Sequence, residues 1–154
     1  MNVVQRLELD PQKLQDMLAK HRKWLQRTYG GVRLDLSGAD LRGADLSGAV
    51  LRSAKLSGTN FARAIMIGTD LQECDLFAAN LDRADLSHAN LENADLRGAF
   101  MRGCRLNGAN MKGVDLRGGE VIKPNHVMRT LYASVGLEED VSDQRAEPIR
   151  AALR

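Results

Sequence analysis

Three groups of side chains in this sequence could perform chemistry, and the first two are the thiols of two cysteines and the imidazoles of three histidines. The cysteines are Cys74 and Cys104, 30 residues apart, and the histidines are His21, His88 and His126. Catalysis or metal binding needs such groups gathered in one site, and motifs such as CxxC, HxxxH, GxGxxG or GxxxxGK[ST] are the usual sign of that. None of these motifs occurs in the sequence. The sequence therefore predicts no catalytic residue, no metal site and no cofactor, and we expect a protein that is not an enzyme.

A third group of reactive side chains is a regularly spaced set of carboxylates and amides. Asp or Asn recurs in steps of five residues, at 12 of 17 such positions between residues 35 and 115. Paired carboxylates could act as acid and base or bind calcium, but a dedicated site would not recur at every fifth residue. A short side chain of this kind can accept hydrogen bonds from backbone N–H groups at a chain corner. We therefore interpret the column as structural.

These polar residues belong to a five-residue phrase that repeats 17 times without an insertion. A large apolar residue stands at the centre of each phrase, from Leu36 to Leu116, and it is Leu in 13 phrases, Met in three and Phe in one. The residue two positions before the centre is Ala in 11 phrases, and the residue two positions after it is Gly in 10. Aromatic residues make up only 4% of the chain, so the core must consist of small and aliphatic side chains.

The spacing of the phrase excludes an α-helix and favours short extended steps. Five residues advance an α-helix by about 500°, so the central residues would spiral around it instead of forming a stripe. In an extended segment, residues two apart point to the same side, so the small and the central residue point inward and the Asp or Asn between them points outward. Glycine in the last position suits a tight corner. A chain that steps and turns in this way must wind into a tube.

Both cysteines occupy the small, inward position of the phrase. We therefore expect Cys74 and Cys104 to be buried, unreactive thiols. Their separation of 30 residues is one and a half coils if four phrases form a coil, which places them on opposite walls. No disulfide and no metal site between them is expected.

The segments ADLRGADLSGAVL and ANLDRADLSHANLENADLRGA resemble the pentapeptide-repeat family, whose pattern is A(D/N)LXX. The resemblance covers residues 34–118. It implies an all-β solenoid, a right-handed quadrilateral β-helix in which residues 20 apart stack on the same face. At roughly 4.8 Å between neighbouring strands, the phrases would form about four coils in a tube ~20 Å long.

The residues before the repeat are expected to close the tube, because a solenoid exposes its core at an uncapped end. Residues 1–33 are predicted to form an N-terminal helical cap, with Asp10 as N-cap, Pro11 as first helical residue, and Gly30 and Gly31 at the end of the helix. Its apolar face would cover the first coil or, alternatively, bind a partner. This face carries Leu14, Met17, Leu18, His21, Trp24 and Leu25.

After the β-helix of residues 34–121, residues 122–154 are predicted to form a C-terminal helical segment and a charged tail. Pro124 would start a short helix and Gly136 would end it. This segment either caps the last coil or forms a homodimer contact, since proteins of the family that it resembles pair through C-terminal coils.

Length and charge set the class of protein. The chain has 154 residues, enough for one domain, with 22 basic and 20 acidic residues and a net charge of +2, which neither requires nor excludes a nucleic-acid partner. No stretch approaches the ~18 apolar residues of a membrane span, and the N-terminus lacks the pattern of a signal peptide. We therefore expect a cytoplasmic protein that does not enter a membrane.

Function is expected at outward positions that the fold does not dictate. In FARAIMIGTD, residues 61–70, Ile65 replaces the usual Asp or Asn, and Ile67 follows as a second outward isoleucine. Phe77 and Phe100 are outward on other faces. These four side chains are candidate contacts for a partner, although single exposed apolar residues are common on protein surfaces.

A second candidate surface is basic. With residues 20 apart stacked, Arg42, Arg63, Arg83 and Arg102 fall on one face, with Asp82 among them. Such a strip attracts the phosphates of a nucleic acid, but the chain offers few aromatic side chains for base stacking. A nucleic-acid partner is therefore not expected, and the arginines are retained as candidate contacts for a protein.

These observations predict a protein-interaction scaffold or structural module with an unidentified protein partner. The alternative implied by the resemblance is DNA mimicry, in which some members of the family bind DNA gyrase through an acidic rod and protect it from quinolones. Residues 34–118 contain 11 acidic and 10 basic residues, a net charge of −1. A duplex mimic needs a strong, continuous negative field, so this sequence departs from that pattern.

Overall fold

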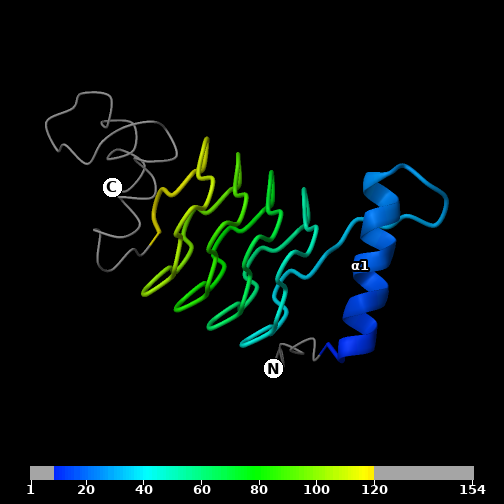
Figure 1. The fold of residues 1–154 in the computed structure, drawn as a ribbon, viewed down its shortest axis with the longest axis horizontal. Coiled ribbons are helices and arrows are strands. Elements are labelled where there is room, and N and C mark those ends of the chain that lie inside the picture. Colours follow the sequence, from blue (N-terminus) through cyan, green and yellow to red (C-terminus); the bar gives the residue numbers. More distant parts are fainter. Residues whose placement is uncertain (1–8, 120–154) are drawn as a thin grey trace, which may run out of the picture.

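A computed structural model describes residues 9–119 of the chain. These residues form one helix, α1 (Pro11–Leu25), followed by a repetitive region that continues to residue 119. Figure 1 shows this region as a stack of similar coils, with α1 lying across one end of the stack. The predicted C-terminal segment, residues 122–154, and the last two residues of the predicted β-helix lie outside the described residues.

The coils are held together by parallel backbone pairing. Within residues 9–119 the β-structure consists of 13 isolated parallel bridges, each joining a residue to the one 20 positions later, from Asp35–Lys55 to Asp95–Asp115. At the first bridge, Leu36 N–H donates to the Lys55 carbonyl (2.9 Å) and Lys55 N–H donates to the Leu34 carbonyl (3.0 Å). Twenty residues, or four phrases, therefore make one coil.

The inside of the stack is filled as the five-residue pattern predicts. All 17 central residues are buried, with at most 5% of their surface exposed, and 14 of the 17 small residues are buried with them. Of the four small residues that carry a hydroxyl or thiol, Thr59, Thr69 and Cys74 each donate a hydrogen bond to the carbonyl of the residue 23 positions earlier, at 2.8, 2.9 and 3.0 Å. The thiol of the fourth, Cys104, points to the Arg105 carbonyl at 3.9 Å. Because these donors have acceptors, burying them costs little.

The outward Asp and Asn residues have the structural role expected of them. In all 12 phrases that carry one, its side-chain oxygen accepts a hydrogen bond from the backbone N–H two residues later, as Asp75 does from Phe77 (3.1 Å) and Asn80 from Asp82 (3.0 Å). Each bond fixes the start of the turn that follows the central residue.

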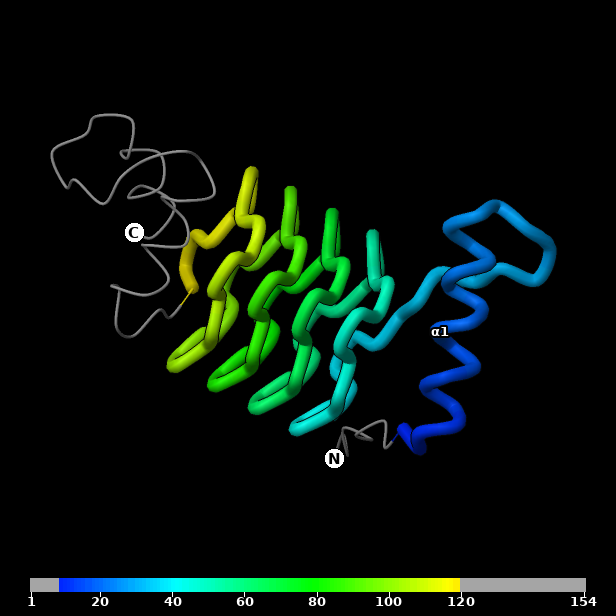
Figure 2. Tube along the Cα trace, viewed as in Figure 1, coloured from blue at the N-terminus to red at the C-terminus, as the bar shows by residue number. Residues whose placement is uncertain are grey.

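Every phrase ends in a corner with a positive φ at its last residue. Figure 2 shows the same corners recurring from coil to coil along the trace. Ten of the 17 corner residues are glycines, which adopt this conformation without strain. The other seven each carry a cost of about 1 kcal/mol. They are Ser53, Arg63, Glu73, Ala78, Arg83, His88 and Asn93.

Helix α1 begins where the sequence predicts but ends earlier. The Asp10 side chain accepts a hydrogen bond from Lys13 N–H (2.8 Å), and Pro11 is the first helical residue. The prediction that Gly30 and Gly31 end the helix is wrong, since Leu25 is its last residue. The chain turns back after the helix and packs against it, and a Cβ at Gly31 would lie 2.5 Å from the backbone nitrogen of Trp24. The close approach of two backbones therefore explains this glycine.

His21 joins α1 to the first coil. Its side chain is fully buried, and Nδ1 accepts a hydrogen bond from Leu34 N–H (2.9 Å), so Nε2 carries the proton and donates to the Arg52 carbonyl (3.0 Å). One coil later, the carbonyl equivalent to that of Arg52 accepts from a backbone N–H of the preceding coil. The first coil has no predecessor, and the imidazole supplies the missing donor. The indole of Trp24 stacks on the same ring at 5.5 Å.

The expected burial of both cysteines is confirmed. Cys74 and Cys104 are free and only 1% and 5% exposed, and burial raises the pKa of both thiols to about 12. They stand in different bridge columns, since 30 is not a multiple of the 20-residue coil.

We predict that replacing His21 with Ala destabilises the protein. The substitution leaves the buried Leu34 N–H and the partly buried Arg52 carbonyl without their partners, and an unpaired buried group costs about 1–3 kcal/mol. Urea denaturation at pH 7.5 should show a lower free energy of unfolding, while the exposed neighbour substitution Lys20→Ala should change it by less than about 0.5 kcal/mol. Equal values for wild type and His21→Ala would mean that these two hydrogen bonds do not stabilise the fold.

The stability contributed by His21 should depend on pH. Burial lowers the pKa of His21 below its ordinary value of 6.5, against the opposing effect of the hydrogen bond to Arg52. The unfolded chain therefore takes up a proton at higher pH than the folded one. This stability is complete above pH 6.5 and is lost as pH falls through the folded pKa. Melting temperatures between pH 7.5 and 5 should fall more steeply for wild type than for His21→Gln, and parallel curves would contradict the assignment.

Both thiols should be unreactive in the native protein. With a pKa of about 12, only about one thiol in ten thousand is ionised at pH 8, and neither sulfur is accessible. Ellman's reagent should therefore detect no thiol within minutes in native buffer and two per chain in guanidinium chloride, since the chain has two cysteines. Rapid native reaction of either one would show that the coils around it open easily.

Candidate interaction surface

The isoleucines of residues 61–70 lie side by side on the outside of one coil. Ile65 and Ile67 are 41% and 42% exposed and flank the buried centre Met66. Ile65 forms bridges with Asp45 in the preceding coil and Asp85 in the following coil. Ile67 stands between Ser47 and Ser87 of the same two coils. The two isoleucines, called here the isoleucine patch, thus replace polar residues of the coils on either side.

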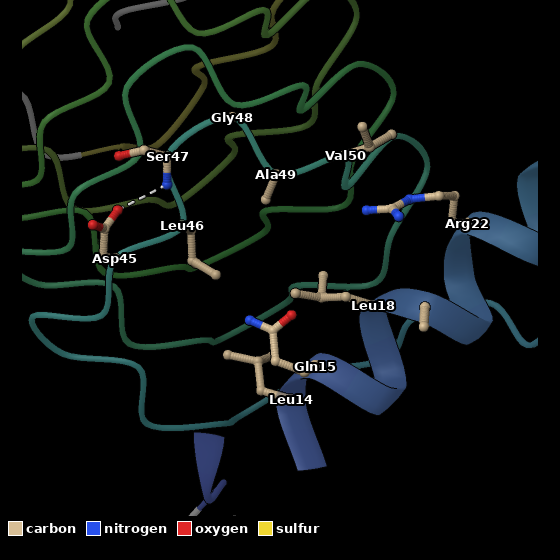
Figure 3. A pocket seen from close by; sticks show the side chains of 11 residues that line it. Leu14, Gln15, Leu18, Arg22, Asp45, Leu46, Ser47, Gly48, Ala49 and Val50 are labelled. Atoms are coloured by element: carbon tan, nitrogen blue, oxygen red, sulfur yellow. Dashed lines mark hydrogen bonds between the residues drawn. The ribbon is translucent and has the colours of Figure 1, made fainter. Parts of the chain in front are cut away.

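A groove between α1 and the first coil lies next to the isoleucine patch. It has a volume of about 290 Å³. Figure 3 shows Leu14 and Leu18 of α1 facing Leu46 of the coil, while Arg22 lies near Val50 at the edge. Asp45, which lines the groove, is the residue that bridges to Ile65. The groove therefore borders the coil that precedes the isoleucine patch, and its lining mixes apolar side chains with the polar residues Gln15, Arg22, Asp45 and Ser47.

The four candidate arginines lie on one face, called here the arginine face. All four are exposed. Arg42 forms an ion pair with Asp40 (2.8 Å), and Arg102 forms one with Asp82 (2.6 Å). Within residues 9–119, the guanidinium groups of Arg63 and Arg83 have neither an ion pair nor a hydrogen bond. The structure thus divides the predicted strip into two neutralised arginines and two that retain their full charge.

The two candidate phenylalanines lie in different columns. Phe77 is 48% exposed, and the guanidinium of Arg97, which also pairs with Asp95 (2.7 Å), lies 5.9 Å from its ring centre. Phe100 is 37% exposed and forms a bridge with Asn80, which places it on the arginine face. Phe100 is therefore closer in the fold to the arginines than to the isoleucine patch.

The remaining reactive groups are not assembled into a site. His21 is buried against the first coil, whereas His88 is exposed at a corner and leans over Gly108, where its Nδ1 would lie 2.6 Å from an added Cβ. His126 lies outside the described residues. Residues 9–119 contain no group of three or more His, Cys, Asp or Glu side chains placed to hold a metal ion.

The helix of the described region is too short and too polar to cross a membrane. The cytoplasmic location expected from the sequence stays a prediction. The described surface thus carries an exposed isoleucine pair with a nearby groove, and a basic face formed by the neighbouring phrase of the same coil.

Comparison with known proteins supplies the family. The family described as pentapeptide repeats matches the chain with eight copies, over residues 32–66, 44–83, 54–93 and 84–118. No curated protein is detectably similar in sequence.

Several solved structures are similar to the chain. The pentapeptide-repeat protein Rfr23 of the cyanobacterium Cyanothece 51142 is 40% identical, over 59% of this chain and 58% of that protein, with a TM-score of 0.45. A pentapeptide-repeat protein from the Arabidopsis thaliana thylakoid lumen is 27% identical, over 77% of this chain and 85% of that protein, with a TM-score of 0.45. QnrB1, a plasmid-mediated fluoroquinolone resistance protein, is 28% identical, over 57% of this chain and 45% of that protein, with a TM-score of 0.30.

The family match extends over residues 32–118, more than half of the chain, and coincides with the region in which every fifth residue forms a bridge with the one 20 positions later. The outward Asp and Asn residues and the glycine corners follow the same period. The chain belongs to the pentapeptide-repeat family.

Proposed function

We propose that this protein is a non-enzymatic interaction scaffold that binds a protein partner through the isoleucine patch and the adjoining groove. The observation that carries the proposal is the placement of two exposed isoleucines, at 41% and 42%, at positions where the neighbouring coils carry polar residues: Asp45 and Asp85 on either side of Ile65, and Ser47 and Ser87 on either side of Ile67. The core does not require either side chain, because Ala64 and Met66 fill the inward positions of that phrase.

The exposed apolar area of the isoleucine patch and the groove is enough for a protein contact of moderate affinity. Burying the exposed part of one isoleucine contributes about 1 kcal/mol. Val50, 38% exposed, and the groove lined by Leu14 and Leu18 extend the apolar area. A partner that covers all of these groups would gain several such increments, which is enough to favour one orientation on an otherwise polar rod.

Gyrase binding by DNA mimicry is the alternative, and it is less well supported. Residues 34–118 carry a net charge of only −1, and the arginine face presents two uncompensated positive charges. The DNA-binding surface of such a target carries arginines and lysines, which an acidic duplex mimic attracts. The positive charges of the arginine face would repel them.

We also propose the finer architecture that the family implies: a right-handed, four-sided β-helix of about four coils, spaced roughly 4.8 Å apart, with α1 as its N-terminal cap. The 20-residue pairing supports the four sides, and the packing of Leu14, Met17 and Leu18 against the core supports the cap. The expected homodimer contact through residues 122–154 lies outside the described residues and stays a prediction.

Replacing Ile65 with Asn and Ile67 with Ser should abolish partner binding without unfolding the protein. The variant restores the residue types of this column, and Asn can form the side-chain bond to backbone N–H that all 12 Asp and Asn phrases make. Quantitative affinity capture from lysate should show at least a tenfold loss of a specific protein, with an unchanged or higher melting temperature.

The matched control for this experiment is Phe77→Ser, which removes an exposed apolar side chain from another column. It should leave capture unchanged. Equal capture by wild type and by the double isoleucine variant would exclude the patch as the contact.

A further inference from the structure

We propose that Arg63, Arg83 and Asn80 form a receptor for the paired carboxylates of an acidic segment in the protein partner. This inference rests on the proposed scaffold function and names the chemistry of the partner. The three side chains line a shallow hollow of about 420 Å³ on the arginine face. Its remaining lining residues are Ala62, Asp82 and Arg102.

The hollow presents hydrogen-bond donors without a competing free acceptor. Asp82 is the carboxylate that lines it, and both oxygens are occupied: Oδ1 accepts from Arg102 N–H (2.9 Å), and Oδ2 accepts from Arg102 Nε (2.9 Å) and Nη2 (2.6 Å). The Asn80 side-chain oxygen accepts from Asp82 N–H (3.0 Å), which leaves its NH2 group as a donor. The site is therefore complementary to an oxyanion.

Arg63 and Arg83 both destabilise the fold at their positions, through backbone strain and through repulsion between their charges. Both adopt a positive φ, 60° at Arg63 and 59° at Arg83, whereas Gly43 and Gly103 occupy the same corner in the coils on either side. Residues 63 and 83 stack on successive coils, so two like charges are held about 5 Å apart at the backbone. Nothing in the core requires them, because the side chains are exposed. Bound anionic groups would relieve this repulsion.

The charges around the hollow favour an acidic peptide over a nucleic acid. Arg42 lies one coil before the hollow and Arg102 lines it, and their ion pairs with Asp40 and Asp82 interrupt any continuous positive track. Nucleic-acid strands need several consecutive cations and, for single strands, aromatic platforms. Two carboxylates on alternate residues of an extended peptide lie about 6.8 Å apart, within reach of two flexible arginines on adjacent coils.

The position of the hollow also fits one partner that contacts both surfaces. Arg63 and Ile65 belong to the same short stretch, separated by the buried Ala64. A peptide with two acidic residues beside an apolar one would place the carboxylates on the arginines and the apolar side chain on the isoleucine patch. The outward side chains of FARAIMIGTD, a basic residue followed by apolar ones, are complementary to such a segment.

The experiment measures binding of a fluorescent peptide by anisotropy at about 50 mM salt, where screening of surface charge is weak. The probe is Gly-Glu-Gly-Glu-Gly, and its twin carries Gln in place of both Glu residues. Wild type should bind the Glu peptide at least tenfold more tightly than the Gln twin, and the variant Arg63→Gln/Arg83→Gln should lose that preference.

The matched control is Arg105→Gln/Lys112→Gln, which removes the same charge from two exposed residues outside the hollow. It should bind the Glu peptide within twofold of wild type. Equal loss of peptide binding in both variants, or no peptide binding by wild type, would overturn the proposal. Binding of an oligothymidine strand that is tighter than peptide binding and depends on Arg63 would overturn it as well.

Competition of inorganic phosphate with the Glu peptide at millimolar concentration would support the oxyanion site, and its absence would count against it.

Two further variants separate this inference from its alternatives. Arg63→Gly/Arg83→Gly should raise the melting temperature, because glycine suits both corners, while losing the peptide; a lower melting temperature would show that the arginines serve the fold. Ile65→Asn/Ile67→Ser should still bind this peptide, which has no apolar side chain. Loss of partner binding in the isoleucine variant, with the peptide still bound, would concern the scaffold proposal. Loss of peptide binding in the arginine variants would concern the arginine site alone.

Discussion

The whole structure depends on parallel pairing between residues 20 positions apart. Each bridge requires that every coil contain the same number of residues, so one inserted residue would shift all later side chains out of their columns. The same period also serves the core, because each phrase contributes one large and one small inward side chain that fill the space between the walls of the coils. Backbone bonds and side-chain packing thus share one period, which explains why 17 phrases follow one another without interruption.

This regularity frees the outer surface for other uses. The inward residues and the corners satisfy the fold, and the Asp or Asn column adds a local hydrogen bond that several phrases lack. Ile65 is one of the positions where that bond is absent, and the coil runs through it unchanged because its neighbours Ala64 and Met66 still face inward. Side chains at such places are chosen by something other than the repeat, which is the physical basis for reading them as a contact surface.

The end of the stack poses a different problem, and His21 shows how the chain solves it. In the next coil, the carbonyl equivalent to that of Arg52 accepts from the preceding coil, and the N–H equivalent to that of Leu34 donates to the residue three positions earlier. The first coil has neither partner. An imidazole with one donor and one acceptor replaces both, and its burial against Trp24 keeps it neutral. The same packing of α1 against the first coil forms the groove lined by Leu14, Leu18 and Leu46, so this helix also shapes the candidate binding surface.

The amino-acid sequence by itself determined which side chains face inward, where the corners fall and which outward residues break the pattern. It could do so because these features follow from a five-residue period that each phrase repeats locally. The C-terminal end of α1, the role of His21 and the groove were decided only by tertiary structure, because they depend on contacts between α1 and a coil that starts some ten residues after it. The pairing of Arg102 with Asp82 is likewise tertiary, since these residues meet only when coils 20 residues apart are stacked, whereas Arg42 pairs with Asp40 two residues away.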